Sequence, residues 1–249
     1  MSKLPKITLY FWIMKICATT LGETAGDLLS MTLNVGYAVS SLILIGFFLA
    51  TLTAQLASRK HHPFLYWAVI LSTSTAGTTL SDYMDRTLGL GYVRGTVILL
   101  TILLAILAFW RLTVRDLSVA SIKTPKVELL YWTAILFSNT LGTALGDFLA
   151  DTSGLGFGGG ALLISGLIGL IVIAHCYSRV SKVLLFWVAF VLTRPLGATM
   201  GDLLTKPHIK GGLDFGTVGS SAILAAILGI FILYSIWSEK KCRELPQII

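Results

Sequence analysis

Four copies of a short motif, each ending in an aspartate, constrain the fold of this chain more than any other feature. The motif is Gly-x-x-x-Gly-Asp, with Ser in place of the second Gly in one copy, and each copy ends fifteen residues after a tryptophan. The four pairs are Trp12 and Asp27, Trp67 and Asp82, Trp132 and Asp147, and Trp187 and Asp202. Such regular self-similarity predicts that the chain consists of four copies of one structural unit.

Long apolar segments surround these motifs. Only 12% of the residues are charged, 55% are hydrophobic, and the mean hydropathy is +0.83. Runs of about 20 apolar residues are typical of helices that cross a membrane. We therefore predict an all-α integral membrane protein, a single transmembrane domain over residues 1–249, with eight transmembrane helices, two in each unit. The predicted repeats cover about residues 8–58, 64–112, 128–178 and 184–238.

The spacing after each aspartate indicates how the two helices of a unit are joined. Nine residues lead from the aspartate to a glycine in the first three units, and fourteen in the fourth, which has an insertion around residues 206–210. Insertions belong in loops, so this interval predicts the turn between two antiparallel helices. All four units then have one orientation, in a pseudo-fourfold or two-by-two arrangement about an axis along the membrane normal. Because the first helices carry the Gly, Thr, Ser and Asp residues, we place them in the centre.

The basic residues indicate the orientation in the membrane. The net charge is +7, and alternate loops differ strongly in their content of Lys and Arg. The rich segments are Lys3–Lys6, Arg59–Lys60, Arg111–Lys126, Arg179–Lys182 and Lys240–Arg243, and the poor loops hold Arg86, Arg94, Lys206 and Lys210. The positive-inside rule places both termini and the rich loops in the cytoplasm. No basic stretch carries interleaved aromatic residues, so nucleic-acid binding is not predicted.

The tryptophans lie near the predicted cytoplasmic start of each first helix, usually beside a Tyr or Phe. Aromatic belts occupy this depth, and we predict that the tryptophans anchor the helices at the membrane surface. Four tandem two-helix units with a fixed Trp resemble a bacterial membrane family described by its own repeat of unknown function, from Tyr10 to about Trp237. The resemblance implies a multi-pass protein of the bacterial inner membrane, and it implies no particular activity.

The repeated aspartates are the chemical puzzle of the sequence. Fifteen residues of helix, at about 1.5 Å per residue, place each aspartate roughly 22 Å from its tryptophan. Charged groups inside a membrane are costly and usually face a cavity, a pore or one another. Four ionised carboxylates at one depth would repel, which predicts that some are protonated or that a cation lies among them. In the alternative interpretation, each aspartate pins its turn through hydrogen bonds to backbone amides.

Residues that break the fourfold pattern favour a functional role. Glu23 precedes Asp27 by four residues, so the two side chains share a helix face. Lys15 and Arg194 add basic groups to the first helices of units one and four. Carboxylate oxygens suit hard ions such as Mg²⁺, Mn²⁺ and Ca²⁺, so Glu23 and Asp27 are candidate metal ligands. The predicted ion or substrate path consists of Asp27, Asp82, Asp147, Asp202, Glu23, Arg194, Lys15, Thr24, Thr79 and Thr199.

Two functions stay open on the sequence. The first is a membrane transporter of a small solute, a divalent metal or proton-coupled cation in the main hypothesis. The second is a non-transporting scaffold or partner subunit. We predict no enzyme, because Thr24, Thr79, Ala144 and Thr199 stand where the Gly-x-Gly-Asp motif of intramembrane aspartyl proteases requires glycine. Apart from a bound cation no cofactor is predicted. The expected partners are the lipid bilayer and a small ion or solute, and a homo-oligomer is compatible with the sequence.

Overall fold

The fold is known from a computed structural model that describes residues 5, 7–58, 61–119, 122 and 124–244, with side chains up to residue 238. Within these residues the chain forms eight α-helices, two in each repeat, as predicted. They are α1 (Leu9–Asp27), α2 (Tyr37–Ala57), α3 (Pro63–Asp82), α4 (Tyr92–Val114), α5 (Pro125–Asp147), α6 (Gly156–Tyr177), α7 (Lys182–Thr205) and α8 (Thr217–Glu244). Pro63 and Pro125 stand in the first turn of their helices, where the missing N–H leaves no hydrogen bond unmade.

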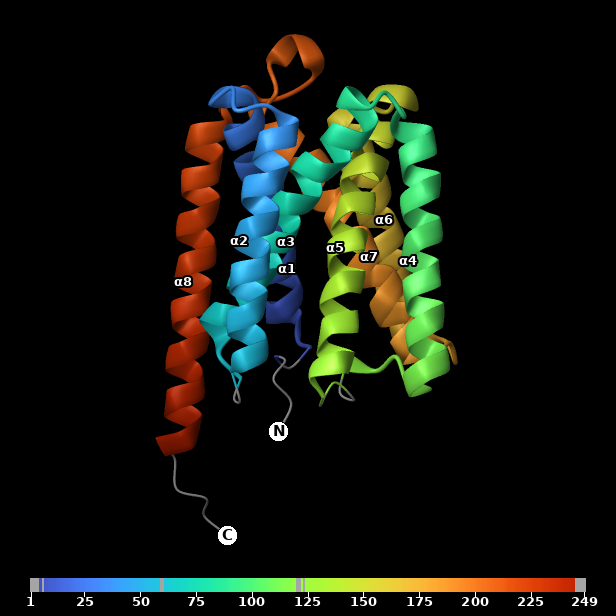
Figure 1. The fold of residues 1–249 in the computed structure, drawn as a ribbon, viewed down its shortest axis with the longest axis vertical. Helices are drawn as coiled ribbons and strands as arrows, with labels where there is room; N and C mark the ends of the chain where they lie inside the picture. The colour runs from blue at the N-terminus through green and yellow to red at the C-terminus, as the bar shows by residue number, and fades with distance from the viewer. Residues whose placement is uncertain (1–4, 6, 59–60, 120–121, 123, 245–249) are drawn as a thin grey trace.

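The helices form two concentric rings. The first helices of the repeats pack side by side in the order α1, α3, α5 and α7, and α7 returns to α1 and closes an inner ring. Each second helix packs against the first helix of the following repeat: α2 against α3, α4 against α5, α6 against α7, and α8 against α1 (Figure 1). The first helices therefore lie in the centre, as predicted. Adjacent repeats interlock, because each one covers its neighbour.

Glycines of the repeated motif allow the inner helices to approach closely. The first glycine of each motif copy lies directly against an inner helix of the next repeat, and a Cβ atom there would come too close to it. The residue contacted has the same place in each repeat, eight positions before the aspartate. The four contacts are Gly22 with Ser74, Gly77 with Asn139, Gly142 with Arg194, and Gly197 with Thr19. Small residues play this part in membrane helices because they let two backbones meet. The same contact recurs around the whole ring, which therefore has pseudo-fourfold symmetry.

The turns that join the two helices of a repeat lie at one end of the molecule (Figure 1). In the first three repeats, one π-helical turn follows the aspartate directly, at Leu28–Thr32, Tyr83–Thr87 and Phe148–Thr152. Gly36 and Gly91 then have φ angles of 80° and 73°, which favour glycine, and α2 and α4 begin after them. In the fourth repeat the inserted residues form a longer turn with a short 3-10 helix at His208–Lys210, as expected for an insertion.

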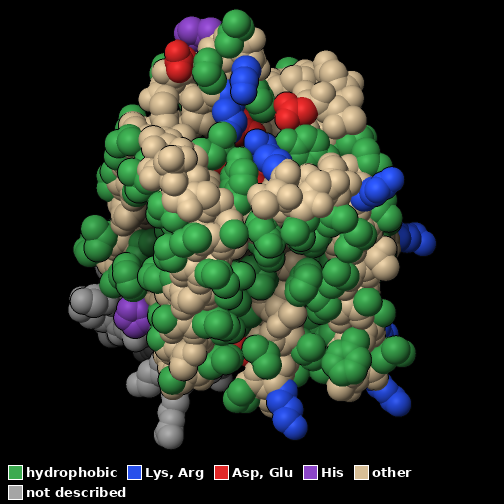
Figure 2. Space-filling view, turned by 45° about the horizontal axis from the view of Figure 1, so that its top comes forward, with side chains coloured by type: hydrophobic (Ala, Val, Ile, Leu, Met, Phe, Trp, Pro, Cys, Tyr) green, Lys and Arg blue, Asp and Glu red, His purple; other side chains and the backbone are tan. Residues whose placement is uncertain are grey.

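The outer helices give the molecule an apolar surface. Figure 2 shows hydrophobic side chains over most of its flank, with Lys and Arg side chains mainly toward the two ends. Among the described residues, five helices, α2, α4, α6, α7 and α8, are long and apolar enough to cross a membrane by themselves. The polar helices α1, α3 and α5 are shielded inside the rings. The chain is therefore a multi-pass membrane protein. Of the basic residues that predict its orientation, Lys3, Lys6, Arg59, Lys60 and Lys123 lie outside the described residues.

Aromatic side chains fill the inner ring at the end opposite the turns, which we call the aromatic end. The residue before each tryptophan contacts the tryptophan of the next repeat, with ring centroids 5.5–6.2 Å apart. The four pairs are Phe11 with Trp67, Tyr66 with Trp132, Tyr131 with Trp187, and Phe186 with Trp12. Trp67, Trp132 and Trp187 are at most 4% exposed. The prediction that the tryptophans are surface anchors is therefore wrong for these three, because they pack in the core between repeats.

Candidate functional site: a buried acidic layer

The four repeated aspartates lie at the end of the inner ring that carries the turns, which we call the acidic end. Asp27, Asp82 and Asp147 are the last residues of α1, α3 and α5, and Asp202 lies in the last turn of α7. All four are 2–3% exposed. With Glu23 from α1, also 3% exposed, they form what we call the acidic layer. The helix ends therefore place five carboxyl groups inside the protein at one level.

Two basic residues bridge the aspartates in pairs. Arg86 contacts Asp82 through Nε at 2.8 Å and Asp147 through Nη2 at 3.2 Å. Lys206 contacts Asp27 and Asp202 through Nζ, at 2.6 and 3.1 Å. Each bridge joins an even-numbered repeat to the next one, so the acidic layer has two-by-two rather than fourfold symmetry. The aspartates of the first three repeats make no capping hydrogen bond to the turns that follow, so the predicted amide pins are absent there.

The sequence interpretation missed Arg86 and Lys206, which it counted among the loop charges. A signal for both was present: each follows the aspartate of its own repeat by four residues, the spacing of an ion pair on one helix face. The other two repeats have Met31 and Asp151 at this place. The two-by-two alternation of the bridges is therefore visible in the sequence once this position is compared among the repeats.

Arg194 crosses the middle of the inner ring and joins all of its helices. Its side chain is fully buried, and its Nη2 contacts Oε2 of Glu23 at 2.9 Å. The same nitrogen donates to the hydroxyls of Thr78 on α3 and Thr143 on α5, at 2.5 and 2.7 Å. Nη1 donates to the carbonyl oxygen of Thr19 on α1 at 3.4 Å. Arg194 therefore lies beside Glu23 in the centre of the inner ring.

Lys15 lies apart from the acidic layer, nearer the aromatic end. It is fully buried, and its Nζ donates to Oδ1 of Asn139 at 3.5 Å and lies 4.2 Å from the centre of the Phe190 ring. Asn139 in turn donates to the hydroxyl of Thr73 at 2.9 Å. Among the ion pairs of the described residues none includes Lys15.

The hydroxyls of the threonines predicted to line the path form hydrogen bonds within their own helices or with an outer helix. The Thr24 hydroxyl donates to its own helix and accepts a hydrogen bond from Ser221 on the outer helix α8 at 2.9 Å. The hydroxyls of Thr79 and Thr199 donate to carbonyl oxygens of their own helices. The neutral oxygens beside the acidic layer belong instead to Thr78 and Thr143, which hold the position of Glu23 in repeats two and three. Both donate to Oε2 of Glu23, at 3.3 and 3.5 Å.

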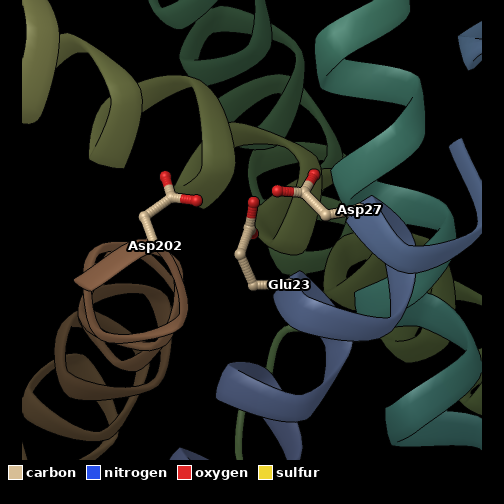
Figure 3. Close-up of side chains that lie close together, drawn as sticks. All are labelled: Glu23, Asp27 and Asp202. Atoms are coloured by element: carbon tan, nitrogen blue, oxygen red, sulfur yellow. The ribbon is translucent and has the colours of Figure 1, made fainter. Parts of the chain in front are cut away.

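Three carboxylates of the acidic layer come close enough to share a metal ion. One oxygen each of Glu23, Asp27 and Asp202 lies within 4.8 Å of the others. Figure 3 shows the three side chains directed toward one another, Glu23 and Asp27 from one helix and Asp202 from another. We call them the carboxylate triad. The structure thus brings together the two predicted metal ligands and adds Asp202. An all-oxygen donor set suits Mg²⁺, Mn²⁺ or Ca²⁺.

Two hollows differ in their relation to this layer. A cavity of about 70 Å³ at the acidic end is lined by Arg86, Asp151, Asp202, Lys206 and Lys210, among others. A larger apolar groove of about 660 Å³ lies at the aromatic end between α1, α6 and α7, and none of its lining residues belongs to the acidic layer. The smaller cavity is therefore the one relevant to the carboxylates, since both residues of the Asp202–Lys206 ion pair form part of its wall.

Comparison with known protein families identifies the repeats. A family model described as Repeat of Unknown Function (DUF347) matches residues 10–61, 65–116, 130–181 and 185–241. The four matches cover most of the chain, and the chain belongs to this family. Neither the comparison with curated proteins nor that with solved structures gave a match.

Proposed function

We propose that this four-repeat member of the DUF347 family is a membrane transporter of a small cation that binds in the acidic layer. The observation that carries the proposal is the carboxylate triad, in which three buried oxygens lie within 4.8 Å of one another. Carboxylates brought so close in a buried site repel unless protons or cations neutralise them. A site of this kind attracts a cation and holds it away from the lipid.

The charge balance of the acidic layer supports a site for an additional cation. Five carboxylates stand against three basic partners, Arg86, Arg194 and Lys206. With every group ionised the layer has a net charge of about −2, which is costly inside a membrane protein and favours uptake of a divalent metal ion or of protons. The proposed substrates are therefore divalent metal cations or cations coupled to protons.

The position of the layer also suits transport. Polar side chains continue from the carboxylates along the centre of the inner ring, through Arg194 to Asn139, Thr73 and Lys15. The apolar outer helices separate this column from the lipid. In the proposed mechanism the basic groups act as internal counter-charges. The aromatic end is the closed side of the path, where the hydroxyl oxygens of Tyr66 and Tyr131 lie 3.0 Å apart.

A second function, a non-transporting scaffold, is favoured by the two bridges. Arg86 and Lys206 tie the aspartates of neighbouring repeats together, so the carboxylates contribute to the closure of the ring. Under this hypothesis the acidic layer is structural. Neutralising one aspartate would then lower the stability of the protein, and no ion would bind or cross.

Flux measurements distinguish the two functions. The purified full-length protein is reconstituted in liposomes that contain a Mn²⁺-sensitive dye or a pH-sensitive dye. We expect Mn²⁺-dependent flux from the wild type and background flux from Asp27→Asn and Glu23→Gln, because each change removes a negative charge from the triad. Asp214→Asn is the matched control, since Asp214 is exposed on the inserted turn and its φ of 56° suits asparagine.

The melting temperature of each variant in detergent completes the test. Full flux through both triad variants would reject the proposal that the transported cation binds in the acidic layer, and no flux in any protein would reject transport. A lower melting temperature in these variants, with no flux in any protein, would establish the scaffold instead.

A further inference from the structure

The two bridges across the acidic layer hold similar positions and differ in chemistry. Arg86 spreads its charge over a planar guanidinium that contacts its two aspartates through different nitrogen atoms. Lys206 presents a single ammonium that contacts both Asp27 and Asp202. An ammonium on a flexible stem is a compact point charge, much like a small free cation. On the Lys206 side, the acidic layer therefore already holds a cation, and that cation is part of the chain.

The carboxylate triad lies on the Lys206 side of the layer. Both aspartates of the triad are the partners of Lys206, while its third member, Glu23, is paired with Arg194. The two aspartates that would bind a metal ion are therefore the same two that Lys206 contacts.

The surroundings of Lys206 allow its side chain to move away from Asp27 and Asp202 without a movement of the main chain. Lys206 follows the last residue of α7 and lines the 70 Å³ cavity, with its side chain 16% exposed. Its amide donates to the carbonyl oxygen of Asp202 at 2.8 Å, and its own carbonyl accepts from the amide of Asp214 at 3.0 Å. Because the backbone is fixed at both groups, rotation of the side chain toward the cavity is enough to separate Nζ from the carboxylates.

We propose that Lys206 is a tethered counter-ion that a divalent cation displaces from Asp27 and Asp202. This inference rests on the proposed function and specifies the charge of the substrate. With Lys206 bound, the two aspartates and the ammonium have a net charge of −1. With Lys206 withdrawn and a divalent cation bound, the same two aspartates are neutralised, and Glu23 keeps Arg194 as its partner. The exchange therefore favours a divalent ion over a monovalent one, and Lys206 covers the site when no ion is bound.

Binding of Mn²⁺ to the purified full-length protein, measured by calorimetry, tests the displacement. Lys206→Gln removes the competing charge, so we expect Mn²⁺ to bind more tightly than to the wild type by about tenfold or more. Lys210→Gln is the matched control, because it removes the same charge from the same turn and cavity, and we expect its affinity to equal that of the wild type. Asp27→Asn should abolish the tight binding. Equal affinities of the Lys206→Gln variant and the wild type would overturn the inference.

A second measurement needs no variant. The unmodified protein is treated with a water-soluble amine-acylating reagent with and without Mn²⁺, and modification at each lysine is followed by mass spectrometry. We expect Mn²⁺ to increase the acylation of Lys206 several-fold, since the released amine no longer contacts the two carboxylates and becomes accessible to the reagent. Acylation of Lys210 should not change. Equal acylation of Lys206 in both conditions would overturn the inference.

The outcomes separate this inference from the transport proposal. Flux that depends on Asp27, together with unchanged binding and acylation at Lys206, would remove the role of Lys206 and leave transport standing. Mn²⁺-dependent release of Lys206 without flux in liposomes would keep the displacement and reject transport.

Discussion

The two ends of the inner ring are built from the same four helices and are closed in opposite ways. At the aromatic end, each repeat supplies a tryptophan and a preceding Phe or Tyr, and the same contact recurs between all neighbouring repeats. At the acidic end, each repeat supplies an aspartate, but the partners differ: Arg86 and Lys206 come from repeats two and four, and Glu23 and Arg194 occur once each.

The difference follows from what each kind of group requires. Aromatic rings pack favourably against other aromatic rings, so one residue type can be repeated around a ring. Buried carboxylates repel one another and need opposite charges, so an identical group in every repeat cannot be stable alone. The acidic end therefore departs from fourfold symmetry at the positions that supply cations. If charge pairing closes the acidic end and packing closes the aromatic end, substitutions at the two ends should lower stability for different reasons.

The largest effect is expected from Arg194→Met. The change leaves Glu23 buried without its cation and removes the hydrogen bonds to Thr78 and Thr143. Removing one partner of a buried ion pair costs on the order of 5 kcal/mol. We expect a large drop in melting temperature or loss of the folded protein, measured by fluorescence-detected gel filtration after heating in detergent.

The double variant Arg194→Met with Glu23→Gln shows whether charge is the cause. Replacing both members of a buried pair by neutral groups is often close to neutral, so the double variant should regain most of the lost stability. A double variant that is no more stable than Arg194→Met would mean that the size and contacts of Arg194, rather than its charge, hold the acidic end together.

A smaller effect is expected from Trp132→Ala at the aromatic end. Trp132 is fully buried and packs against Tyr66, so its truncation leaves a cavity that costs about 3 kcal/mol. Trp12→Ala is the matched control, because Trp12 has the same place in repeat one but is half-buried beside the apolar groove. We expect the melting temperature to fall clearly more for Trp132→Ala. Equal losses would contradict the assignment of Trp132 to the core and of Trp12 to the wall of the apolar groove.

The fold was largely predictable because each repeat carries the same signals. The recurring Trp and Asp gave the four units, and the aspartate-to-glycine interval placed the turns and the insertion. The buried tryptophans were not predictable in this way, since a Trp near a helix start fits both a membrane belt and a contact between repeats. Whether a tryptophan faces lipid or another repeat depends on which helix packs against it. The packing of each second helix against the next repeat is a tertiary feature, which the periodicity of the sequence does not predict.

The candidate site was predictable only in part. The shared helix face of Glu23 and Asp27 follows from their spacing, and the centrality of Arg194 follows from its position in a first helix. The approach of Asp202 to Asp27 depends on the closure of α7 onto α1, which no local pattern contains. The choice between Thr78 and Thr79 is a matter of helix rotation, because adjacent residues on a helix point about 100° apart. The rotation of each inner helix about its own axis is fixed by the glycine contacts between neighbouring helices.

The smallest effect is expected from Asp85→Asn, at the edge of the acidic end. Asp85 lies in the turn after α3 and accepts a hydrogen bond from Ser81 at 3.3 Å, and burial raises its pKa from 3.8 to about 6 although Ser81 and Arg86 oppose the rise. Between these two pH values the folded protein holds the proton more tightly than the unfolded chain, so stability falls as the pH rises through this window. Asparagine does not titrate, and the advantage of the variant should therefore grow from pH 4 to pH 6 and then stay constant.

Melting temperatures of the wild type and Asp85→Asn across this pH range measure the difference, which we expect to reach a few degrees. Asp214→Asn is the control without a pH-dependent difference, since Asp214 is exposed. A difference between Asp85→Asn and the wild type that is constant with pH would show that Asp85 is ionised throughout, and that the charge of Arg86 outweighs burial at this carboxylate as well. Charge pairing would then determine the ionisation of the carboxylates from the centre of the acidic end to its rim, and burial would not set the protonation of Asp85.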